Sequence, residues 1–189
     1  HSLLSNITTL KGSTSSTSTN NVFYGDTMDI YVKPGSTVQQ GQFVRFVTDT
    51  FDSSTYLFAE PFTYSSLADL DKFNSLGKNV AMFGIALKTA SSTSEFLESV
   101  RICTKGLCLV KISNTSPVLA LGNTTPEVSY HGRPCLLNTD GYGVNLATAT
   151  APTTSYSYLE IGTFMETGAS VATADTFALV YVNPIIVSG

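Results

Sequence analysis

The sequence predicts an all-β protein, a compact β-barrel or β-sandwich of short antiparallel strands with one short helix. Charged residues make up only 13% of the chain, against a usual share of about 25%, so the polar surface must come largely from 23 Ser and 26 Thr. Thr, Val, Tyr and Phe suit a pleated, half-buried surface, whereas the Glu, Lys, Arg and Gln of exposed helix faces are scarce. Short apolar runs separated by turn residues are regular from residue 80 onward, which is typical of a sandwich or small barrel.

The first 20 residues differ in composition from the rest of the chain. They end in the polar, low-complexity tract Gly12–Asn20, which buries too little apolar surface to offset the entropy lost on ordering. We therefore expect residues 1–20 to form a flexible N-terminal arm and residues 21–189 to form a single barrel or sandwich domain. Its first expected strands are 22–24, 28–32 and 42–47, with a turn at Lys33–Gly35.

One short amphipathic helix is predicted over Ser66–Leu76. Its apolar residues recur every three positions, at Leu67, Leu70, Phe73 and Leu76. Gly77 is a suitable residue to end it. We expect the apolar stripe to plug a barrel end or to dock on a sheet, in preference to an exposed interface.

The second half of the chain contains most of the predicted strands. They are expected at 80–87, 100–104, 107–112, 135–137, 144–147, 156–164 and 177–182. Residues 148–155 are predicted to form a polar surface loop. The apolar run Ile185–Val187, which follows Pro184, is interpreted either as a final strand or as a segment that packs on another subunit.

A faint internal repeat links two of these regions. The segment Phe83–Ser92 returns 78 residues later as Ile161–Ser170, and each copy is followed by a second apolar run, at 100–103 and at 178–182. This pattern predicts two strand-turn-strand units in equivalent places of one barrel, although chance similarity in a chain so rich in Gly, Ala, Ser and Thr is the alternative.

Three cysteines are too few, and odd in number, for a disulfide framework. A two-residue hairpin turn at Lys105–Gly106 would place Cys103 opposite Cys108, close enough for a disulfide bridge. The alternative, which we favour, is a pair of free thiols that act as small apolar side chains.

Charge and hydropathy exclude two classes of partner. With a net charge of −4 and only 10 scattered Lys and Arg, the chain has no basic stripe for nucleic acid. No run approaches the ~20 apolar residues that span a bilayer, so we expect a soluble protein without membrane contact. The first residue is His1 and not Met, from which we expect a tag remnant or an excised fragment.

The search for catalytic residues yields one weak candidate. His131 lies four residues before Cys135, and a nearby base could activate a thiol nucleophile. Gly132 and Pro134 between them indicate a turn, and no nucleophile signature surrounds the pair, so we favour a turn histidine beside a buried core cysteine.

Metal and carboxylate sites are equally weak. Asn138–Gly141 has two oxygen side chains before a glycine, but it lacks the remaining ligands of a calcium loop and is also ordinary turn chemistry. Three pairs of acids, Asp69 with Asp71, Glu95 with Glu98 and Glu160 with Glu166, are interpreted as solvated faces or helix caps. We therefore predict a protein that is not an enzyme, with no catalytic, cofactor-binding or metal-binding residues.

The run Phe83–Ser92, leading to Val100–Ile102, resembles the Gly-x-Ala-Leu-x-x-Ala segment of the small β-barrel proteins that decorate viral capsids. In tailed phages these are the capsid decoration or head-fibre proteins. The earlier Pro34–Val44 is similar to their usual opening, a Pro-Gly turn and a Val followed by Gly before the next strand. The resemblance covers residues 33–112, with an echo at 160–182. The helix at 65–77 and the many aromatic residues depart from the pattern, and a virion protein of a large eukaryotic DNA virus fits as well as a phage protein.

This resemblance implies a non-enzymatic virion protein that decorates or stabilises a capsid, as a homo-oligomer with a trimer favoured, bound to a viral shell protein. The alternative is a receptor- or glycan-binding head domain of a viral fibre, for which Tyr156 and Tyr158 are the residues to test.

Overall fold

The computed structural model describes residues 24–66, 83–113, 132, 134–145, 158–165 and 177–187. This part of the chain is all-β and has no helix, which confirms the predicted fold class. Its strands are β1 Tyr24–Val32, β2 Thr37–Val38, β3 Phe43–Phe51, β4 Ser54–Pro61, β5 Phe83–Ala86, β6 Ala90–Ser91, β7 Ser99–Lys111, β8 Pro134–Leu137, β9 Gly143–Asn145, β10 Tyr158–Phe164 and β11 Phe177–Val187.

Several expectations fall outside the described ranges. The N-terminal arm at residues 1–20, almost all of the helix at 66–76 and the loop at 148–155 belong to this group. Within the described residues, no helix has the length and apolar character needed to cross a membrane.

The first half of the molecule is a closed barrel. Its strands are hydrogen bonded in the order β1-β4-β3-β5-β7, and β7 pairs back with β1 to complete the circle. All of these pairs are antiparallel except β1 with β4, which are parallel at Tyr31↔Phe58 and Val32↔Ala59. Alternate residues of each strand point inward and form one buried apolar cluster, which includes Val44, Ala86 and Ile102.

β7 is longer than the sequence pattern predicts, and the hairpin expected at Lys105–Gly106 is wrong. The strand runs through these residues without turning back, and Gly106 pairs with Gly25 of β1 on one edge and with Val182 of β11 on the other. The Lys-Gly dipeptide is a local turn signal, but strands on both edges hold it extended. Gly106 has a φ of 126°, a conformation that suits glycine.

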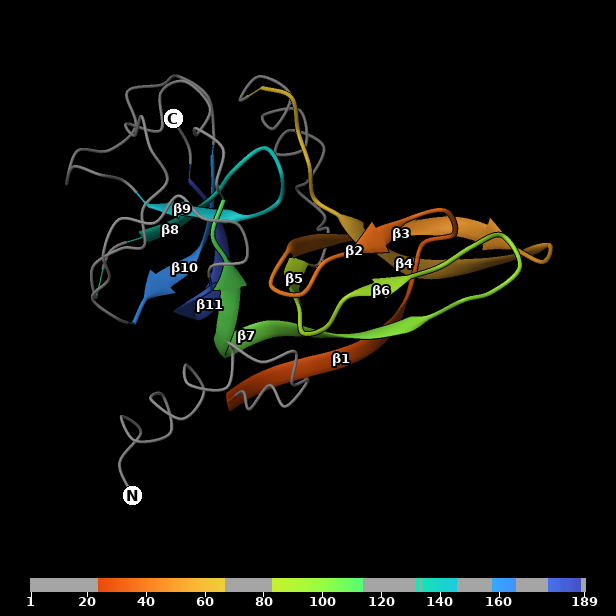
Figure 1. Cartoon of the computed structure of the whole chain (residues 1–189), viewed down its shortest axis with the longest axis horizontal. Coiled ribbons are helices and arrows are strands. Elements are labelled where there is room, and N and C mark those ends of the chain that lie inside the picture. The colour runs from red at the N-terminus through yellow and green to blue at the C-terminus, as the bar shows by residue number, and fades with distance from the viewer. Residues whose placement is uncertain are drawn as a thin grey trace.

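The second half of β7 begins another closed barrel. Its order is β7-β11-β10-β8-β9, and a parallel bridge between Ile112 and Gly143 joins the end of β7 to β9. Figure 1 shows β7 bending between the two groups of strands, with β8 to β11 on the left and β1 to β6 on the right. Each barrel therefore uses one half of the same strand.

The register of the strands shows that the two barrels are copies of one design. In the first, Ile85 pairs with Cys103 and Ala86 with Ile102. In the second, Thr163 pairs with Tyr181 and Phe164 with Val180, and each of these four residues lies 78 positions after its counterpart. The internal repeat expected from the sequence is therefore present as a repeat of strand pairing.

Backbone hydrogen bonds outside the strands repeat as well. Gly41 N–H donates to Ala86 O at 2.7 Å, and Gly132 N–H donates to Phe164 O at 2.8 Å. Both glycines have a positive φ, 80° and 85°.

The closure of each barrel follows the same rule. Lys33 N–H donates to Ala59 O and Ser113 N–H donates to Gly143 O, both at 2.9 Å, beside the parallel pairs that close the circles. The prediction that both repeated units lie in one barrel is wrong. Each unit lies in its own barrel, because β7 supplies the last strand of the first barrel and the first strand of the second barrel.

The cores of the two barrels have different residues at equivalent positions but keep a similar total volume. At equivalent inward positions the first barrel has Phe46, Ala59, Ala86 and Val100, whereas the second has Leu137, Gly143, Phe164 and Ala178. A larger residue at one position is offset by smaller ones at the others, as close packing requires. The barrels also join, because the outward-facing Phe43, Ile85 and Cys103 of the first belong to the apolar cluster of the second.

Candidate functional site

The clearest departure from the repeat is the hairpin of β3 and β4, and this arm is our candidate site. Its pairing runs from Val44↔Pro61 out to Phe51↔Ser54, while the equivalent β8–β9 hairpin runs only from Cys135↔Asn145 to Leu137↔Gly143. Residues 52–57 are exposed, and Figure 1 shows the arm reaching away from the rest of the molecule. Because loop insertions on a rigid scaffold often carry function, the arm is the part to examine for binding.

A tight turn closes the end of the arm. Asp52 and Ser53 have positive φ angles of 48° and 63°, the pattern of a type I′ turn, whose twist matches that of the flanking strands. Asp is one of the few non-glycine residues that accept this conformation readily. This hairpin and β4 were not predicted, although Asp52–Ser53 between two runs that contain Thr and aromatic residues is a recognisable turn signal.

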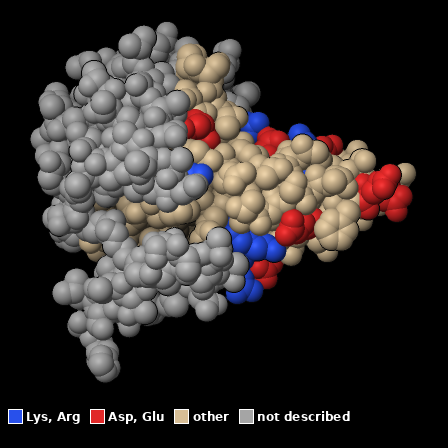
Figure 2. All heavy atoms as spheres, in the orientation of Figure 1, with Lys and Arg blue, Asp and Glu red and all other residues tan. Residues whose placement is uncertain are grey.

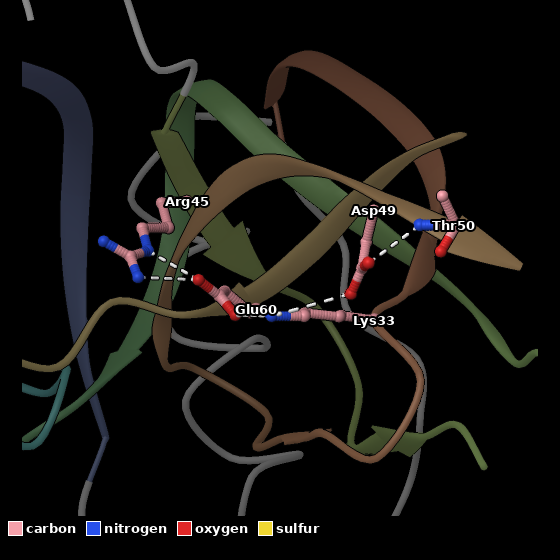
Figure 3. A network of polar contacts seen from close by, with 5 residues as sticks. All are labelled: Lys33, Arg45, Asp49, Thr50 and Glu60. Atoms are coloured by element: carbon pink, nitrogen blue, oxygen red, sulfur yellow. Dashed lines mark hydrogen bonds and ion pairs between the residues drawn. The ribbon is translucent and has the colours of Figure 1, made fainter. Parts of the chain in front are cut away.

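A network of charged groups braces the base of the arm (Figure 3). Glu60 of β4 accepts hydrogen bonds from Arg45 of β3 at 2.7 and 2.8 Å. Lys33 Nζ lies 3.3 Å from Glu60 Oε2 and 3.7 Å from Asp49 Oδ2, and Asp49 Oδ1 accepts a bond from the Thr50 backbone. The Arg45 and Glu60 side chains are partly buried, with 24% and 14% of their surface exposed, and the network joins β3 and β4 to Lys33, which follows β1.

The outer part of the arm carries apolar side chains in water. Tyr56 is 42% exposed and Leu57 is 45% exposed, and they point to opposite faces of the hairpin because strand residues alternate. The Tyr56 and Phe58 rings lie 5.9 Å apart on one face. Both faces of the arm therefore offer apolar contact area.

A second exposed apolar residue lies on the loop between β6 and β7. Phe96 is 64% exposed, and its backbone is held by Thr93, whose N–H donates to Phe96 O at 2.8 Å and whose Oγ1 accepts from Phe96 N–H at 3.0 Å. These bonds present the ring on an ordered turn.

Nearby cations are engaged with carboxylates. Lys88 Nζ lies 3.4 Å from Glu98, and Arg101 makes a two-point contact with Asp29 at 2.9 and 3.1 Å. The hydrogen bond from the Ser91 backbone N–H lowers the pKa of the Glu98 carboxyl, and Lys88 lowers it to a smaller extent. In the view of Figure 2 the far end of the molecule on the arm side is acidic, and Lys and Arg lie nearer the body.

The end of β11 also exposes apolar side chains. Ile185 is 47% exposed and Ile186 is 37% exposed, and both pair with β10, opposite Glu160 and Leu159. The run is in a strand, but it continues β11 without a break and is not a separate final strand. A role in contacting another subunit stays a prediction.

The structure argues against Cys135 as the nucleophile of a His–Cys pair. Cys135 is fully buried in the second barrel, at the position that Val44 occupies in the first, and burial raises the pKa of its thiol. His131 lies outside the described residues. A buried, protonated thiol cannot attack a substrate in solvent, so Cys135 is a core residue.

The Asn138–Gly141 segment forms the turn between β8 and β9. Asp140 Oδ1 accepts the Tyr142 N–H at 3.0 Å, and its Oδ2 accepts the Ser113 hydroxyl at 2.6 Å. Asn138 Nδ2 donates to the same hydroxyl at 2.9 Å. These oxygens organise the turn, as expected, and across the described ranges no three His, Cys, Asp or Glu residues are grouped as metal ligands.

Cys103 and Cys108 are both buried and not bridged. They lie on one continuous strand, not on two arms of a hairpin, yet their thiols interact where β7 bends. A hydrogen bond from the Cys108 thiol lowers the pKa of Cys103, while burial raises the pKa of Cys108.

Most of the remaining candidate residues lie outside the described ranges. Asp69, Asp71, Glu166 and Tyr156 lie outside the described residues, and of Tyr158 only the backbone pairing with Val187 is described. Burial raises the pKa of Glu160 in β10, and Glu95 and Glu98 lie on the loop before β7.

Comparison with protein-family models, curated proteins and solved structures finds no match to this chain. A proposal of function therefore depends on the repeated barrel and on the exposed groups of the arm, the Phe96 loop and the end of β11.

Proposed function

We propose that this chain is a non-enzymatic virion structural protein that decorates or stabilises a capsid through contacts with itself and with a viral shell protein. The observation that supports this most is the repeated barrel. The two segments that resemble capsid decoration proteins, Pro34–Val44 and Phe83–Ser92, form adjacent parts of the first barrel, and the echo at 160–182 has the equivalent place in the second.

The exposed groups suit binding better than catalysis. The described surface presents apolar side chains at separate places, at Tyr56 and Leu57 on the arm, at Phe96 and at Ile185 and Ile186. Aromatic residues such as Tyr are enriched among the few residues that carry most of the binding energy at protein interfaces. The candidate nucleophile and the candidate calcium loop have structural roles instead, in the core and in a turn.

The end of β11 is a suitable self-contact. Two adjacent isoleucines at the end of β11, beyond its pairing with β7, would leave water if a second copy covered them, at about 25 cal/mol per Å² of apolar area. Changing Ile185 and Ile186 to Ser should then reduce the mass measured by light scattering. The trimer implied by the resemblance is the expected assembly.

The proposal is tested by the protein composition of virus particles purified from the source of this sequence. Mass spectrometry should find the chain in a fixed ratio to the major shell protein. Absence of the chain from particles, together with a monomer in solution at high concentration, would contradict the proposal. Selective binding on a glycan array, without particle association, would favour the receptor-binding alternative.

A further inference from the structure

We propose that Cys103 and Cys108 form a disulfide when the folded protein meets hydrogen peroxide, and that this bridge fixes the bend of β7 between the two barrels. In the structure both thiols are free. The inference goes beyond the proposed function, because it concerns the junction of the barrels whether or not the chain decorates a capsid.

The first step is that an irregularity of β7 turns both cysteines to one side. Cys108 follows Cys103 by five positions, so on a regular strand the two would lie about 16 Å apart on opposite faces. The register with β1 shifts between Cys103 and Lys105, which leaves Thr104 as an extra residue on β7. A bulge of this kind bends the strand and reverses the alternation of its side chains beyond it. Cys103 and Cys108 therefore lie in the same buried apolar cluster.

The second step is that the two thiols are in contact at the bend. The Cys108 thiol is hydrogen bonded to the Cys103 sulfur, and the Lys105 N–H donates to the same sulfur. These two bonds lower the pKa of Cys103, whereas burial raises the pKa of Cys108. The thiolate is the form of cysteine that reacts with oxidants. The pair therefore combines one thiol that ionises more easily with a protonated thiol beside it.

An oxidant can reach the pair from the surface at the bend. Cys103 is buried, but Lys105, whose N–H contacts its sulfur, is exposed. Hydrogen peroxide is little larger than water, so a small local opening of this junction admits it. We expect slow oxidation of the folded protein, because the sulfur lies beneath the surface and not on it.

The chemistry needs two thiols and one peroxide. The Cys103 thiolate attacks one peroxide oxygen, the O–O bond breaks, and hydroxide leaves while Cys103 becomes a sulfenic acid. The Cys108 sulfur then attacks the Cys103 sulfur, and the S–S bond forms as the S–O bond breaks. The leaving hydroxyl takes the Cys108 proton as water. The hydroxide of the first step takes the proton that Cys103 lost, so the two thiols give two electrons to peroxide, which becomes two water molecules.

The third thiol of the cluster serves as an internal control. Cys135 is fully buried, and burial raises the pKa of its thiol. The hydrogen bond to the Cys103 sulfur comes from Cys108 and not from Cys135. Oxidation should therefore leave Cys135 reduced.

The bridge should act locally, on the connection between the barrels. β7 is the strand that both barrels share, and it bends between them (Figure 1). A link from Cys103 to Cys108 closes a short loop around Lys105 and Gly106, so it constrains the unfolded chain little. The expected effect is slower amide exchange of Thr104–Gly106 in the oxidised protein, with the outer strands unchanged.

The test is thiol counting on the folded full chain. The protein is treated with hydrogen peroxide, the reaction is stopped with catalase, and the chain is unfolded and alkylated with iodoacetamide before its mass is measured. We expect three labels without peroxide, one label after it, and three again when a reductant precedes alkylation. Trypsin cleaves after Lys105, so the bridge should join two peptides that separate on reduction.

A pair of variants tests which thiols react. Cys135→Ala should still form the bridge and take up no label after peroxide, whereas Cys108→Ala should form no bridge. Three labels in the treated wild type, at a peroxide dose that oxidises the chain unfolded in urea, would overturn the inference. So would a bridge to Cys135, or a loss of labels that reductant does not restore. If a variant fails to fold by circular dichroism, the tryptic peptides of the wild type decide. Particle composition tests the proposed function separately, so the two can fail independently.

Discussion

Replacement of Gly162 by alanine should destabilise the second barrel strongly. A Cβ on Gly162 would overlap the carbonyl oxygen of Tyr181 and would lie 2.8 Å from its carbonyl carbon and 3.0 Å from Val182 Cα. All three atoms are backbone of the neighbouring β11, so no side chain can rotate out of the way. The strands must separate at the point where Gly162 pairs with Val182.

The size of the effect follows from these contacts. Overpacking of this kind costs about 1–3 kcal/mol, and weakening of two neighbouring hydrogen bonds adds about 1 kcal/mol each. We expect a loss of about 3 kcal/mol in the free energy of unfolding, which for a chain of this length lowers Tm by about 6–12 °C. Gly84→Ala, the equivalent change in the first barrel, should cost less, because its nearest backbone contact, Cys103 O, would lie farther away, at 2.6 Å.

Urea unfolding followed by far-ultraviolet circular dichroism measures these differences. Gly35→Ala is the control, since its φ is 76° and no atom lies within 4 Å of the added Cβ. It reports the cost of backbone strain alone, about 1–2 kcal/mol. A Gly162→Ala variant no less stable than Gly35→Ala would refute the close approach of β10 and β11.

Three further predictions concern the cores and the titration of a partly buried acid. Burial raises the pKa of Glu160, so the folded state keeps a proton that the unfolded chain has lost. The contribution of this proton to folding stability is full below the unfolded pKa and falls as pH rises through the folded pKa. Glu160→Gln should therefore gain stability relative to wild type between about pH 4 and about pH 7. An equal difference at both pH values in thermal unfolding would contradict this. Tyr64→Phe should cost about 1–3 kcal/mol in urea unfolding, because the buried Tyr64 hydroxyl donates to Leu137 O and that carbonyl would lose its partner; no change would show that water replaces the bond. Gly143→Ala should be destabilising because its Cβ would lie 2.6 Å from Cys135 Sγ. Adding Cys135→Ala should recover about 1 kcal/mol of the lost stability. Strict additivity of the two substitutions in the double-mutant cycle would place the clash elsewhere.

The fold class and the repeat could be predicted from the sequence for physical reasons. Scarce charges and many Thr, Val, Tyr and Phe residues require a pleated surface with hydroxyl groups outside. Gly84 and Gly162 recur because each lies where a neighbouring strand approaches too closely for a Cβ. This pattern involves residues that are close together in the chain, so it can be recognised in the sequence.

The closure of two barrels could not be predicted, because it depends on the partners of one strand. Lys105–Gly106 is a turn by local chemistry, and only the pairing of Gly106 with Gly25 and with Val182 holds it extended. Pairing between residues so far apart in sequence leaves no periodic signal.

The arm was missed for a related reason. The outer half of β4 is exposed on both faces and so lacks the alternation of apolar and polar residues that marks a half-buried strand. The network of Lys33, Asp49 and Glu60 joins three segments, and a lone lysine or glutamate in the sequence does not indicate which partner it meets.

The contacts of Gly106 in solution test most directly whether β7 is shared by two equivalent barrels. Nuclear Overhauser effects from the Gly106 backbone protons should reach both Gly25 on β1 and Val182 on β11 in the same folded state. Contacts between Thr104 and Leu107 across a turn, with none to β11, would show instead that the chain reverses at Lys105–Gly106 and would contradict the account.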